Sequence, residues 1–321
     1  MKPKILVITP VKHIEGVSEL IESCGEVTYM DHPDVEDVMQ VVQNYSAIFT
    51  NPNKSKIYLG PELIDKATIL RVIATASTGT NHIDMDYAKR RNIKVLSLTE
   101  ERDVIEKITS TAEHAFTLTM ASLRRLVHSH NDALIGEWDY TKYIGRQLNS
   151  LTIGVIGFGR LGSLYAKYCQ AFGSKVMVFD PYKEVKDANI LQVKNIEELM
   201  RSCDILSLHV HVNDETKGMI NKTLLNMMKN DILIVNTSRG EVINELDLVN
   251  FLENNTNAMF ATDVLTDEIR NRMNSPIFRY AKNNSKQIVL TQHIGGMTKE
   301  AQEIAYGHAA KMLQGFFKNK G

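Results

Sequence analysis

Three polar residues of this 321-residue chain, Arg239, Glu268 and His293, are of types that could do chemistry together. An arginine can clamp a carboxylate through two parallel hydrogen bonds. A histidine can exchange a proton with a hydroxyl group, and a glutamate bonded to its other ring nitrogen would fix its tautomer and raise its pKa. Singly, such an arginine is more often part of a surface ion pair and such a histidine is more often structural, so the prediction depends on their surroundings.

All three residues follow segments that we predict to be strands. Arg239 lies in the stretch NTSRG, and Glu268 lies five residues after Asp263. His293 stands shortly before Gly295 and Gly296. The preceding strands are expected over 232–236, 258–263 and 288–291. Because a doubly wound sheet places its ligand contacts at the carboxyl ends of its strands, we expect these side chains at one edge of a sheet.

The stretch LTIGVIGFGRLGSLYAKYCQAFGSKVMVFD, residues 151–180, predicts a dinucleotide site beside them. A strand leads into Gly157, Gly159 and Gly162, which are spaced as G-x-G-x-x-G, and a helix over 161–172 follows. The first glycine permits a tight turn, the second lets a pyrophosphate approach the backbone, and the third lets helix and strand pack closely. The N-terminus of the helix offers N–H groups and a positive dipole to the phosphates.

A second strand over 175–179 ends in Asp180, about twenty residues beyond the glycines. There a carboxylate can accept hydrogen bonds from an adenosine ribose and would repel a 2′-phosphate, which favours NAD over NADP. Glycines also serve ordinary turns, but the strands, the helix and the acid around them favour cofactor binding. Beside a nicotinamide, the arginine, glutamate and histidine described above predict a site for hydride transfer.

The composition is typical of a globular protein with two domains. Hydrophobic residues make up 43% and charged residues 23% of the chain, and the net charge is -1. This balance gives no field that would attract nucleic acid or a membrane. The three cysteines, Cys24, Cys169 and Cys203, are odd in number and far apart, which indicates free thiols in a reducing compartment. MKPKILVITP lacks a signal peptide pattern and no apolar run reaches about 18 residues, so we expect a cytoplasmic protein.

Residues 1–98 alternate short apolar runs with helical segments, which predicts a parallel sheet. The expected strands span 5–8, 27–29, 47–49, 71–75 and 93–96, and the expected helices span 16–23, 35–44, 61–67 and 85–90. The fourth strand is followed by a loop of small residues that includes Ser77, Thr78 and Gly79. The N–H groups of this loop could hold an anion, or the loop could be a plain turn.

From residue 151 the same alternation continues, with the first strand over 152–156, a further strand over 204–209 and helices over 195–201, 222–228 and 244–254. Between the two α/β regions, Ser110 and Glu113 have capping-box spacing and precede a helical apolar pattern. This predicts one long helix toward Gly136 that could bury one face in a partner. We expect structural or surface roles for its histidines, His114, His128 and His130. A last helix over 298–317 could pack on either region.

His209 and His211 alternate on one predicted strand and could share a face, as a two-histidine metal site requires. No third ligand has suitable spacing, so we expect no metal and place these side chains beside the nicotinamide.

Six stretches together resemble the D-isomer-specific 2-hydroxyacid dehydrogenases. They are STGTNHID (77–84), GFGRLG (157–162), SLHVHVNDET (207–216), NTSRGEVINE (236–245), ATDVL with the following glutamate (261–268) and TQHIGG (291–296). Within that family the pattern is most similar to the D-3-phosphoglycerate dehydrogenases and the hydroxypyruvate or glyoxylate reductases. Gln292, Ile269 and His211 stand where the family often has proline, so the substrate within the family stays open.

The resemblance implies an NAD-dependent oxidoreductase that moves a hydride between NAD(H) and a small D-2-hydroxy acid or 2-keto acid, with Arg239, Glu268 and His293 as catalytic residues. The implied substrate contacts are Ser77, Thr78, Gly79, Arg239 and His293. The implied cofactor contacts are Thr78, Gly157, Gly159, Arg160, Leu161, Gly162, Asp180, His209, Val210, Thr237, Ser238, Arg239, Asp263, His293, Gly295 and Gly296.

The resemblance also implies two doubly wound, Rossmann-like α/β domains. An NAD-binding domain of residues 99–294 would be inserted into a flavodoxin-like substrate domain formed by residues 1–98 and 295–321. The long helix after Ser110 would help to form a homodimer.

Two alternatives stay open. The substrate could be 3-phosphoglycerate, which needs a cationic pocket for which Lys54, Lys56 and Arg71 are candidates by position, or the protein could be a hydroxypyruvate or glyoxylate reductase. Alternatively, the same fold could serve an NAD(H)-sensing interaction protein similar to the corepressors that resemble this family. Turnover with a panel of 2-keto acids would separate the enzyme from the sensor.

Overall fold

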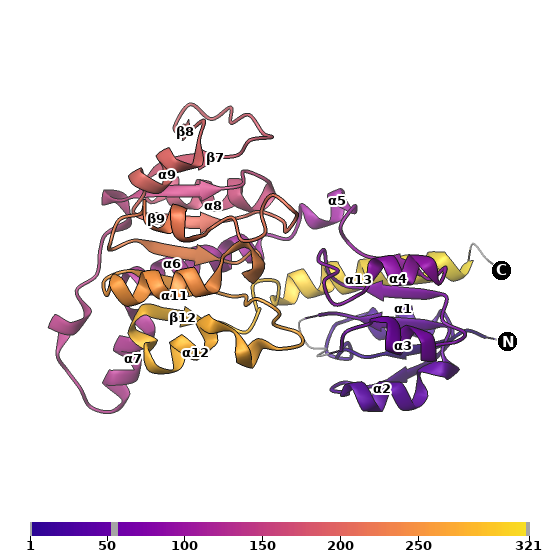
Figure 1. Ribbon diagram of the computed structural model, residues 1–321. Helices are drawn as coiled ribbons and strands as arrows, with labels where there is room; N and C mark the ends of the chain where they lie inside the picture. The colour runs from indigo at the N-terminus through magenta and orange to yellow at the C-terminus, as the bar shows by residue number, and fades with distance from the viewer. Residues whose placement is uncertain (1, 53–56, 319–321) are drawn as a thin grey trace. The chain divides into compact units, whose positions relative to one another are not determined.

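A computed structural model describes residues 2–52 and 57–318. The chain forms two compact units, which we describe separately (Figure 1). Unit 1 contains Met1–Ile108 and Gly296–Gly321, and unit 2 contains Thr109–Gly295. Lys54 and Lys56, two of the candidates for a phosphate pocket, lie outside the described residues.

Unit 1 is built on a parallel five-stranded sheet in the order β2-β1-β3-β4-β5. This is the flavodoxin-like order, in which the direction of winding reverses between β1 and β3. The strands are β1 (Lys4–Val7), β2 (Glu26–Tyr29), β3 (Ala47–Thr50), β4 (Val72–Thr75) and β5 (Lys94–Leu96). The helices are α1 (Val17–Glu22), α2 (Val35–Val41), α3 (Pro61–Lys66), α4 (Met85–Arg90), α5 (Arg102–Ile105) and α13 (Lys299–Lys318).

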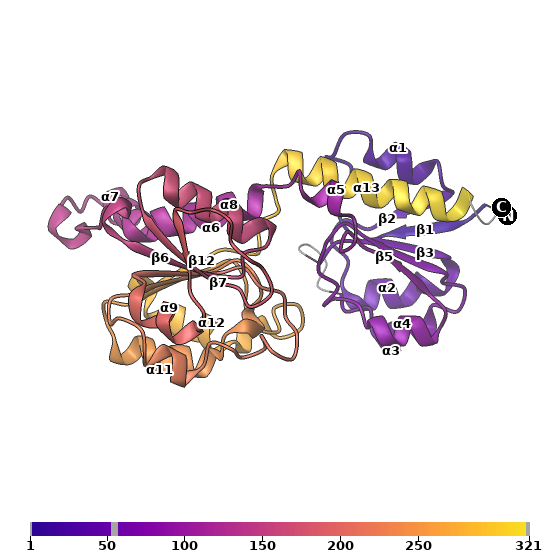
Figure 2. The same ribbon diagram turned by 90° about the horizontal axis from the view of Figure 1, so that it is seen from above.

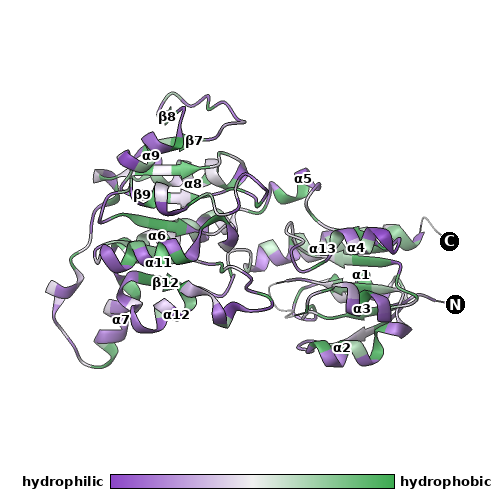
Figure 3. Cartoon of the chain, viewed as in Figure 1, coloured by the Kyte–Doolittle hydropathy of each residue, from purple (hydrophilic) through white to green (hydrophobic). Residues whose placement is uncertain are grey.

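Side chains alternate across this sheet, and those of the central strands β1, β3 and β4 are buried on both faces, which is why these strands are almost continuously apolar (green in Figure 3). Ile5 and Val7 pack with α1 and α13, whereas Leu6 and Ile8 pack with α2, α3 and α4. Figure 2 shows these two groups of helices on opposite faces of the sheet. The C-terminal helix α13 therefore completes the core of the unit that the N-terminal segment begins.

Unit 2 is built on a parallel seven-stranded sheet in the order β12-β11-β10-β9-β6-β7-β8. The strands are β6 (Thr152–Ile156), β7 (Lys175–Phe179), β8 (Ile190–Gln192), β9 (Ile205–Leu208), β10 (Leu233–Asn236), β11 (Met259–Thr262) and β12 (Ile288–Leu290). The strand order reverses between β6 and β9, and open α/β sheets bind their ligands outside the carboxyl ends of the strands at such a point. The glycine motif directly follows β6 and therefore lies there.

Two helical layers cover the unit 2 sheet (Figures 1 and 2). One layer contains α6 (Ser110–Leu123) and α8 (Arg160–Ala171), whose buried side chains share a core with the sheet. The opposite layer contains α9 (Ile196–Ser202), α10 (Lys222–Leu225), α11 (Glu245–Asn254) and α12 (Pro276–Asn283). The prediction of two parallel α/β sheets is confirmed.

The expected long helix from Ser110 toward Gly136 is wrong in two respects. Arg125 adopts a left-handed φ of 48°, so the helix breaks into α6 and α7 (Leu126–Leu134). The predicted capping box is also absent, because Thr109 is the N-cap and the hydroxyl of Ser110 is buried without a hydrogen bond. The hydroxyl of Thr109 instead donates to Glu113 Oε1 at 2.5 Å.

One further predicted helix is shorter than expected, and some observed elements were not predicted. The helix expected over 222–228 ends at Leu225, and no element was predicted for β8, α5 or α12. Among the described residues no helix is both long and apolar enough to cross a membrane.

Candidate active site

The glycine motif places its three glycines in three different environments. Gly157 has a φ of 85°, and a Cβ there would lie 2.5 Å from the carbonyl oxygen of His209, so no other residue fits this turn. A Cβ on Gly162 would overlap the carbonyl oxygen of Gly157, so this position requires close approach of α8 to β6. Both environments match the roles predicted for the first and third glycines.

A Cβ on Gly159, in contrast, would meet no protein atom within 4 Å. Gly159 is the N-cap of α8, and no side chain caps this helix end. The N-terminal N–H groups of α8, with Arg160 and Leu161 as its first residues, are thus available to an anion. The residues of this loop fit the pyrophosphate of a dinucleotide.

Asp180, after β7, is held by backbone N–H groups on both carboxylate oxygens. Phe158 N–H donates to Oδ2 at 2.7 Å, which ties the acid to the glycine loop. The N–H groups of Tyr182 and Lys183 donate to Oδ1 at 2.9 and 3.0 Å. Each oxygen has more than one lone pair, so a bound ribose can share these acceptors.

His209 follows β9 and is neutral. Its Nε2 lies 2.8 Å from Ser207 Oγ, and its ring lies 5.1 Å from the ring of Tyr165 on α8. Burial lowers the pKa of His209 to about 3. The segment of His209 packs on the glycine loop: a Cβ on Gly157 would meet His209 and Val210, and a Cβ on Gly162 would lie 3.3 Å from His209 Cβ.

The NTSRG segment after β10 is shaped by its first residue. Asn236 donates from Nδ2 to the carbonyl oxygen of Arg239 at 2.9 Å and accepts from the N–H and the hydroxyl of Ser238 at 3.0 and 2.7 Å. Arg239 Nη1 donates to the carbonyl oxygen of Ser238 at 2.7 Å. The hydroxyl of Thr237 is buried without a hydrogen bond partner in the protein. Such an unpartnered group, at the same sheet edge as the glycine loop, fits a site that a ligand completes.

The segment after β11 packs closely on the NTSRG segment. A Cβ on Gly240 would overlap the peptide between Leu265 and Thr266, so only glycine allows this contact. The buried carboxylate of Glu245 accepts from Thr266 N–H at 2.8 Å and from the hydroxyl of Ser275 at 2.6 Å. Glycine and glutamate together fix the loop that carries Glu268.

Glu268 and His293 form a direct pair. Glu268 Oε1 lies 2.5 Å from His293 Nδ1, and Glu268 Oε2 accepts from Leu265 N–H at 3.2 Å. Both side chains are partly exposed, 17% for Glu268 and 23% for His293. His293 adopts a left-handed φ of 56°, a conformation that non-glycine residues adopt mainly where the surrounding structure imposes it.

Asp263 is a buried carboxylate beside this pair. It accepts from the hydroxyl of Thr291 at 2.5 Å and from the N–H groups of Ile294 and Gly295 at 2.8 and 2.7 Å. His114 Nε2 on α6 lies 3.4 Å from Asp263 Oδ1. Burial alone would raise the pKa of Asp263, but these hydrogen bonds outweigh burial and lower the pKa below its usual value. Sequence reasoning gave His114 only a structural or surface role.

In unit 1, the loop with Ser77, Thr78 and Gly79 follows β4 and is held by its own side chains. Ser77 Oγ lies 2.8 Å from Thr75 Oγ1 and donates to the carbonyl oxygen of Gly79 at 2.8 Å. Thr99 Oγ1 donates to the carbonyl oxygen of Thr78 at 2.7 Å. Of the predicted cofactor residues, Gly296 lies in unit 1 as well, as the first residue of its C-terminal segment.

Buried polar groups that the sequence analysis did not single out support this loop. Asn51 Nδ2 donates to the carbonyl oxygen of Ala76 at 2.9 Å, and His82 Nε2 lies 3.0 Å from Thr75 Oγ1. Both side chains are buried. His82 lies within the STGTNHID stretch, whereas no local motif marks Asn51. Arg71, the third candidate for a phosphate pocket, lies instead over the rings of Phe316 and Phe317 of α13.

In unit 2, all predicted site residues follow the carboxyl ends of strands of the sheet. Most of them follow the five neighbouring strands β12, β11, β10, β9 and β6, and Asp180 follows β7. Because the strands are parallel, these ends form one edge. Within residues 2–52 and 57–318 no group of three or more histidines, cysteines or acids could hold a metal ion.

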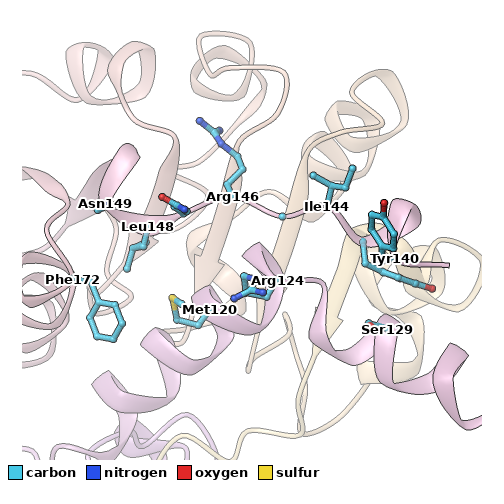
Figure 4. A pocket seen from close by; sticks show the side chains of 12 residues that line it. Met120, Arg124, Ser129, Tyr140, Ile144, Arg146, Leu148, Asn149 and Phe172 are labelled. Carbon is cyan, nitrogen blue, oxygen red and sulfur yellow. The ribbon is translucent and has the colours of Figure 1, made fainter. Parts of the chain in front are cut away.

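A separate pocket of about 700 Å³ lies away from this edge (Figure 4). It is lined by side chains of α6, α7, the end of α8 and the segment 140–149. Met120, Arg124, Tyr140, Arg146 and Phe172 are among them. None of the predicted cofactor or substrate residues lines it.

Comparisons with known proteins identify relatives along the whole chain. A family model described as D-isomer specific 2-hydroxyacid dehydrogenase, NAD binding domain, matches residues 116–295. D-3-phosphoglycerate dehydrogenase of Bacillus subtilis is 30% identical over 94% of this chain and 54% of that protein. Glyoxylate reductase of Thermococcus litoralis is 29% identical over 100% of this chain and 95% of that protein.

Among solved structures, D-lactate dehydrogenase from Aquifex aeolicus in complex with NAD and lactic acid matches with a TM-score of 0.81 and 26% identity, covering 98% of this chain and 96% of that one. The chain spans about half the length of the curated phosphoglycerate dehydrogenases that it matches.

Proposed function

The chain belongs to the D-isomer-specific 2-hydroxyacid dehydrogenase family, and from this premise we propose that it is an NAD-dependent oxidoreductase acting on a small D-2-hydroxy acid or 2-keto acid. The observation that carries the proposal is the Glu268–His293 pair, which lies at the sheet edge that also bears Arg239 and the glycine loop. A histidine with its Nδ1 fixed by a carboxylate is arranged to exchange protons through Nε2.

The proposed cofactor site lies along this edge. The N–H groups at the start of α8 hold the phosphates, and Asp180 accepts hydrogen bonds from the adenosine ribose. His209, Val210, Thr237 and Asp263 line the nicotinamide end in this proposal. NAD supplies the hydride acceptor for the 2-hydroxy acid, and NADH supplies the donor for the 2-keto acid.

The proposed catalytic residues bind the substrate and transfer the proton. Arg239 has one N–H engaged with the carbonyl oxygen of Ser238, and we propose that its other donors clamp the substrate carboxylate. His293 gives a proton to the carbonyl oxygen of a 2-keto acid, or takes one from the hydroxyl of a 2-hydroxy acid. Glu268 keeps the proton on Nδ1 and stabilises the imidazolium that forms when the hydroxyl is deprotonated. In unit 1, we propose the N–H groups of Ser77, Thr78 and Gly79 as donors to a substrate carboxylate.

The test is a spectrophotometric assay of NADH oxidation with 3-phosphohydroxypyruvate, hydroxypyruvate, glyoxylate and pyruvate. We expect turnover with at least one of them, and we expect His293→Ala to abolish it while NADH binding, measured by fluorescence, persists. His32→Ala, which removes an exposed histidine of unit 1, is the matched control and should retain full activity. An unchanged rate in His293→Ala would refute the mechanism.

The same panel selects among substrates. The curated relatives are named D-3-phosphoglycerate dehydrogenase and glyoxylate reductase, so 3-phosphohydroxypyruvate and glyoxylate are the first compounds to compare. Negligible turnover with all four, together with NADH-dependent binding of a protein partner, would instead indicate an NAD(H)-sensing protein.

We further propose that the protein forms a homodimer through the apolar segment 126–144. Its exposed large apolar side chains are Leu126, Val127, Leu134, Ile135, Trp138, Tyr140 and Ile144. In Figures 1 and 2, α7 and the residues after it extend away from the rest of unit 2. So many exposed apolar side chains in one segment, Trp138 and Tyr140 among them, are typical of an interface, and a second copy of the chain would cover them.

The proposed location is the cytoplasm. Cys24, Cys169 and Cys203 are all free thiols, and the last two are buried. Burial raises the pKa of each of these two thiols to about 12, so they are unreactive. Unpaired cysteines suit a reducing compartment.

A further inference from the structure

The segment 291–295 carries His293 and depends on Asp263 for its conformation. Asp263 Oδ1 accepts from Ile294 N–H at 2.8 Å and Oδ2 accepts from Gly295 N–H at 2.7 Å. These two residues directly follow His293, whose φ is 56°. By accepting from these two N–H groups, one on each oxygen, the Asp263 carboxylate fixes the backbone that follows His293. We infer that this stabilises the left-handed conformation of His293.

The direction of the hydrogen bonds around Asp263 can be assigned. The lowered pKa of Asp263 keeps it a carboxylate, which only accepts, so the hydroxyl of Thr291 donates to Oδ1. With its hydrogen committed, Thr291 Oγ1 must accept from His114 Nε2, which lies 3.0 Å away. The resulting relay runs from His114 through Thr291 to Asp263, and it fixes the proton of His114 on Nε2.

The relay links helix α6 to the segment that carries His293. His114 and Thr291 are 177 positions apart in the chain. Asp263 and His114 are both largely buried, with side-chain exposures of 2% and 15%. Gly295 also packs on α6, because a Cβ there would lie 3.3 Å from Thr111 Cγ2 and 3.1 Å from Asp263 Oδ2. The start of α6 is therefore the support against which the segment 291–295 is held.

We propose that His114 is a positioning residue for the proposed reaction: through Thr291 and Asp263 it holds the backbone on which His293 exchanges its proton. The proposal rests on the proposed function. The partners of His114 are Thr291 and Asp263, so its proposed effect on the reaction is exerted through the geometry of the segment 291–295.

The experiment compares His114→Ala with His114→Gln. Alanine removes the donor to Thr291, whereas the Nε2 amide of glutamine replaces it. We expect kcat to fall about tenfold in His114→Ala, as for the loss of one hydrogen bond to a charged network, while the KM for NADH stays within about twofold. His114→Gln should recover most of kcat. Thr117→Ala, which removes an exposed hydroxyl of the same helix that bonds only within α6, is the matched control.

A second measurement does not depend on turnover. Hydrogen–deuterium exchange, read by mass spectrometry on peptides covering 291–296, should be faster in His114→Ala and in Thr291→Val, and should match the wild type in His114→Gln and Thr117→Ala. The double variant His114→Ala/Thr291→Val should lose no more than either single variant, because both break one relay.

The outcomes separate the two proposals. If the wild type turns over none of the 2-keto acids, the proposed function fails, while the exchange measurement still decides the role of His114. Unchanged exchange and kcat in His114→Ala would overturn the positioning role. Equal losses in the alanine and glutamine variants, accompanied by equal drops in melting temperature, would show that the imidazole serves only to pack the core and would overturn it too.

Discussion

Asp180 accepts a hydrogen bond from Phe158 N–H of the glycine loop, and we propose that its charge also disfavours a 2′-phosphate. Single substitutions can separate these two roles. We expect Asp180→Asn, which keeps an acceptor oxygen but no charge, to lower the ratio of kcat/KM for NADH over NADPH by about tenfold. Asp180→Ala should lower this ratio similarly and also weaken NADH binding, because the loop loses its anchor. A ratio that is the same in all three proteins would contradict the predicted selectivity.

His209 should make stability depend on pH. Its pKa in the folded protein is about 3, against 6.5 for the free side chain, so between these values the unfolded chain binds more protons than the folded protein. The free energy of unfolding contributed by His209 is therefore fully present above about pH 6.5 and is lost as the pH falls toward 3.

Urea unfolding at pH 7.5 and pH 5 checks this sign. The wild type should lose more stability between the two pH values than His209→Gln, which removes the titrating group. If the two proteins lose the same amount, His209 is already protonated in the folded state or solvated there.

Gly240 lets two loops pack together: because it has no side chain, the NTSRG segment can contact the Leu265–Thr266 peptide. We expect Gly240→Ala to cost about 1–3 kcal/mol of stability through overpacking. The displaced loop carries Glu268, so kcat should also fall, by about a hundredfold if the pair with His293 shifts by an ångström.

Gly307→Ala is the matched control. Gly307 lies in α13, and a Cβ there would meet nothing within 4 Å, so this substitution should stabilise unit 1 by about 0.5–1 kcal/mol and leave kcat unchanged. Thermal unfolding and the NADH assay measure both effects. Wild-type activity in Gly240→Ala would show that the loop tolerates the displacement.

Elements with a strong local pattern could be predicted from the sequence. The strand over 152–156, the glycine turn and the helix after it were located within a residue, since apolar periodicity and glycine spacing act within about thirty residues. The Glu268–His293 pair was expected because each residue follows a strand of the same parallel sheet, and the structure brings them together.

Features that depend on distant contacts could not be predicted. The break at Arg125 has no glycine or proline to mark it, and Gly145 packs against the carbonyl oxygen of Leu123 at this point. The hydrogen bond of His114 could not be predicted for the same reason, because its partner Thr291 comes from the other end of unit 2. Nothing in the local spacing around His114 indicates that a buried carboxylate will lie beside it.

At the scale of the whole molecule, the proposed dimer can be measured directly. Trp138 is the single tryptophan of the chain and is 88% exposed, so its fluorescence reports whether the apolar segment 126–144 is covered. We expect the wild type to have twice the chain mass of 36.2 kDa by light scattering and a blue-shifted emission that moves to the red on dilution. Ile135→Glu should give the mass of one chain.

Leu191→Glu is the matched control, because Leu191 is 57% exposed on β8, outside the proposed interface. It should leave the mass and the emission of the wild type unchanged. A wild type that has the mass of one chain at every concentration would refute the dimer.

The position of α13 in the chain has a consequence for synthesis. Its buried residues Ala305, Tyr306, Ala309, Ala310 and Leu313 cover one face of the sheet of unit 1. They emerge from the ribosome only after all of unit 2 has been made, so the β-strands of residues 4–96 must wait with that face open. We therefore expect unit 1 to finish folding after unit 2 although its strands are translated before unit 2, and a ribosome stalled before residue 299 to carry a folded unit 2 and an incomplete unit 1.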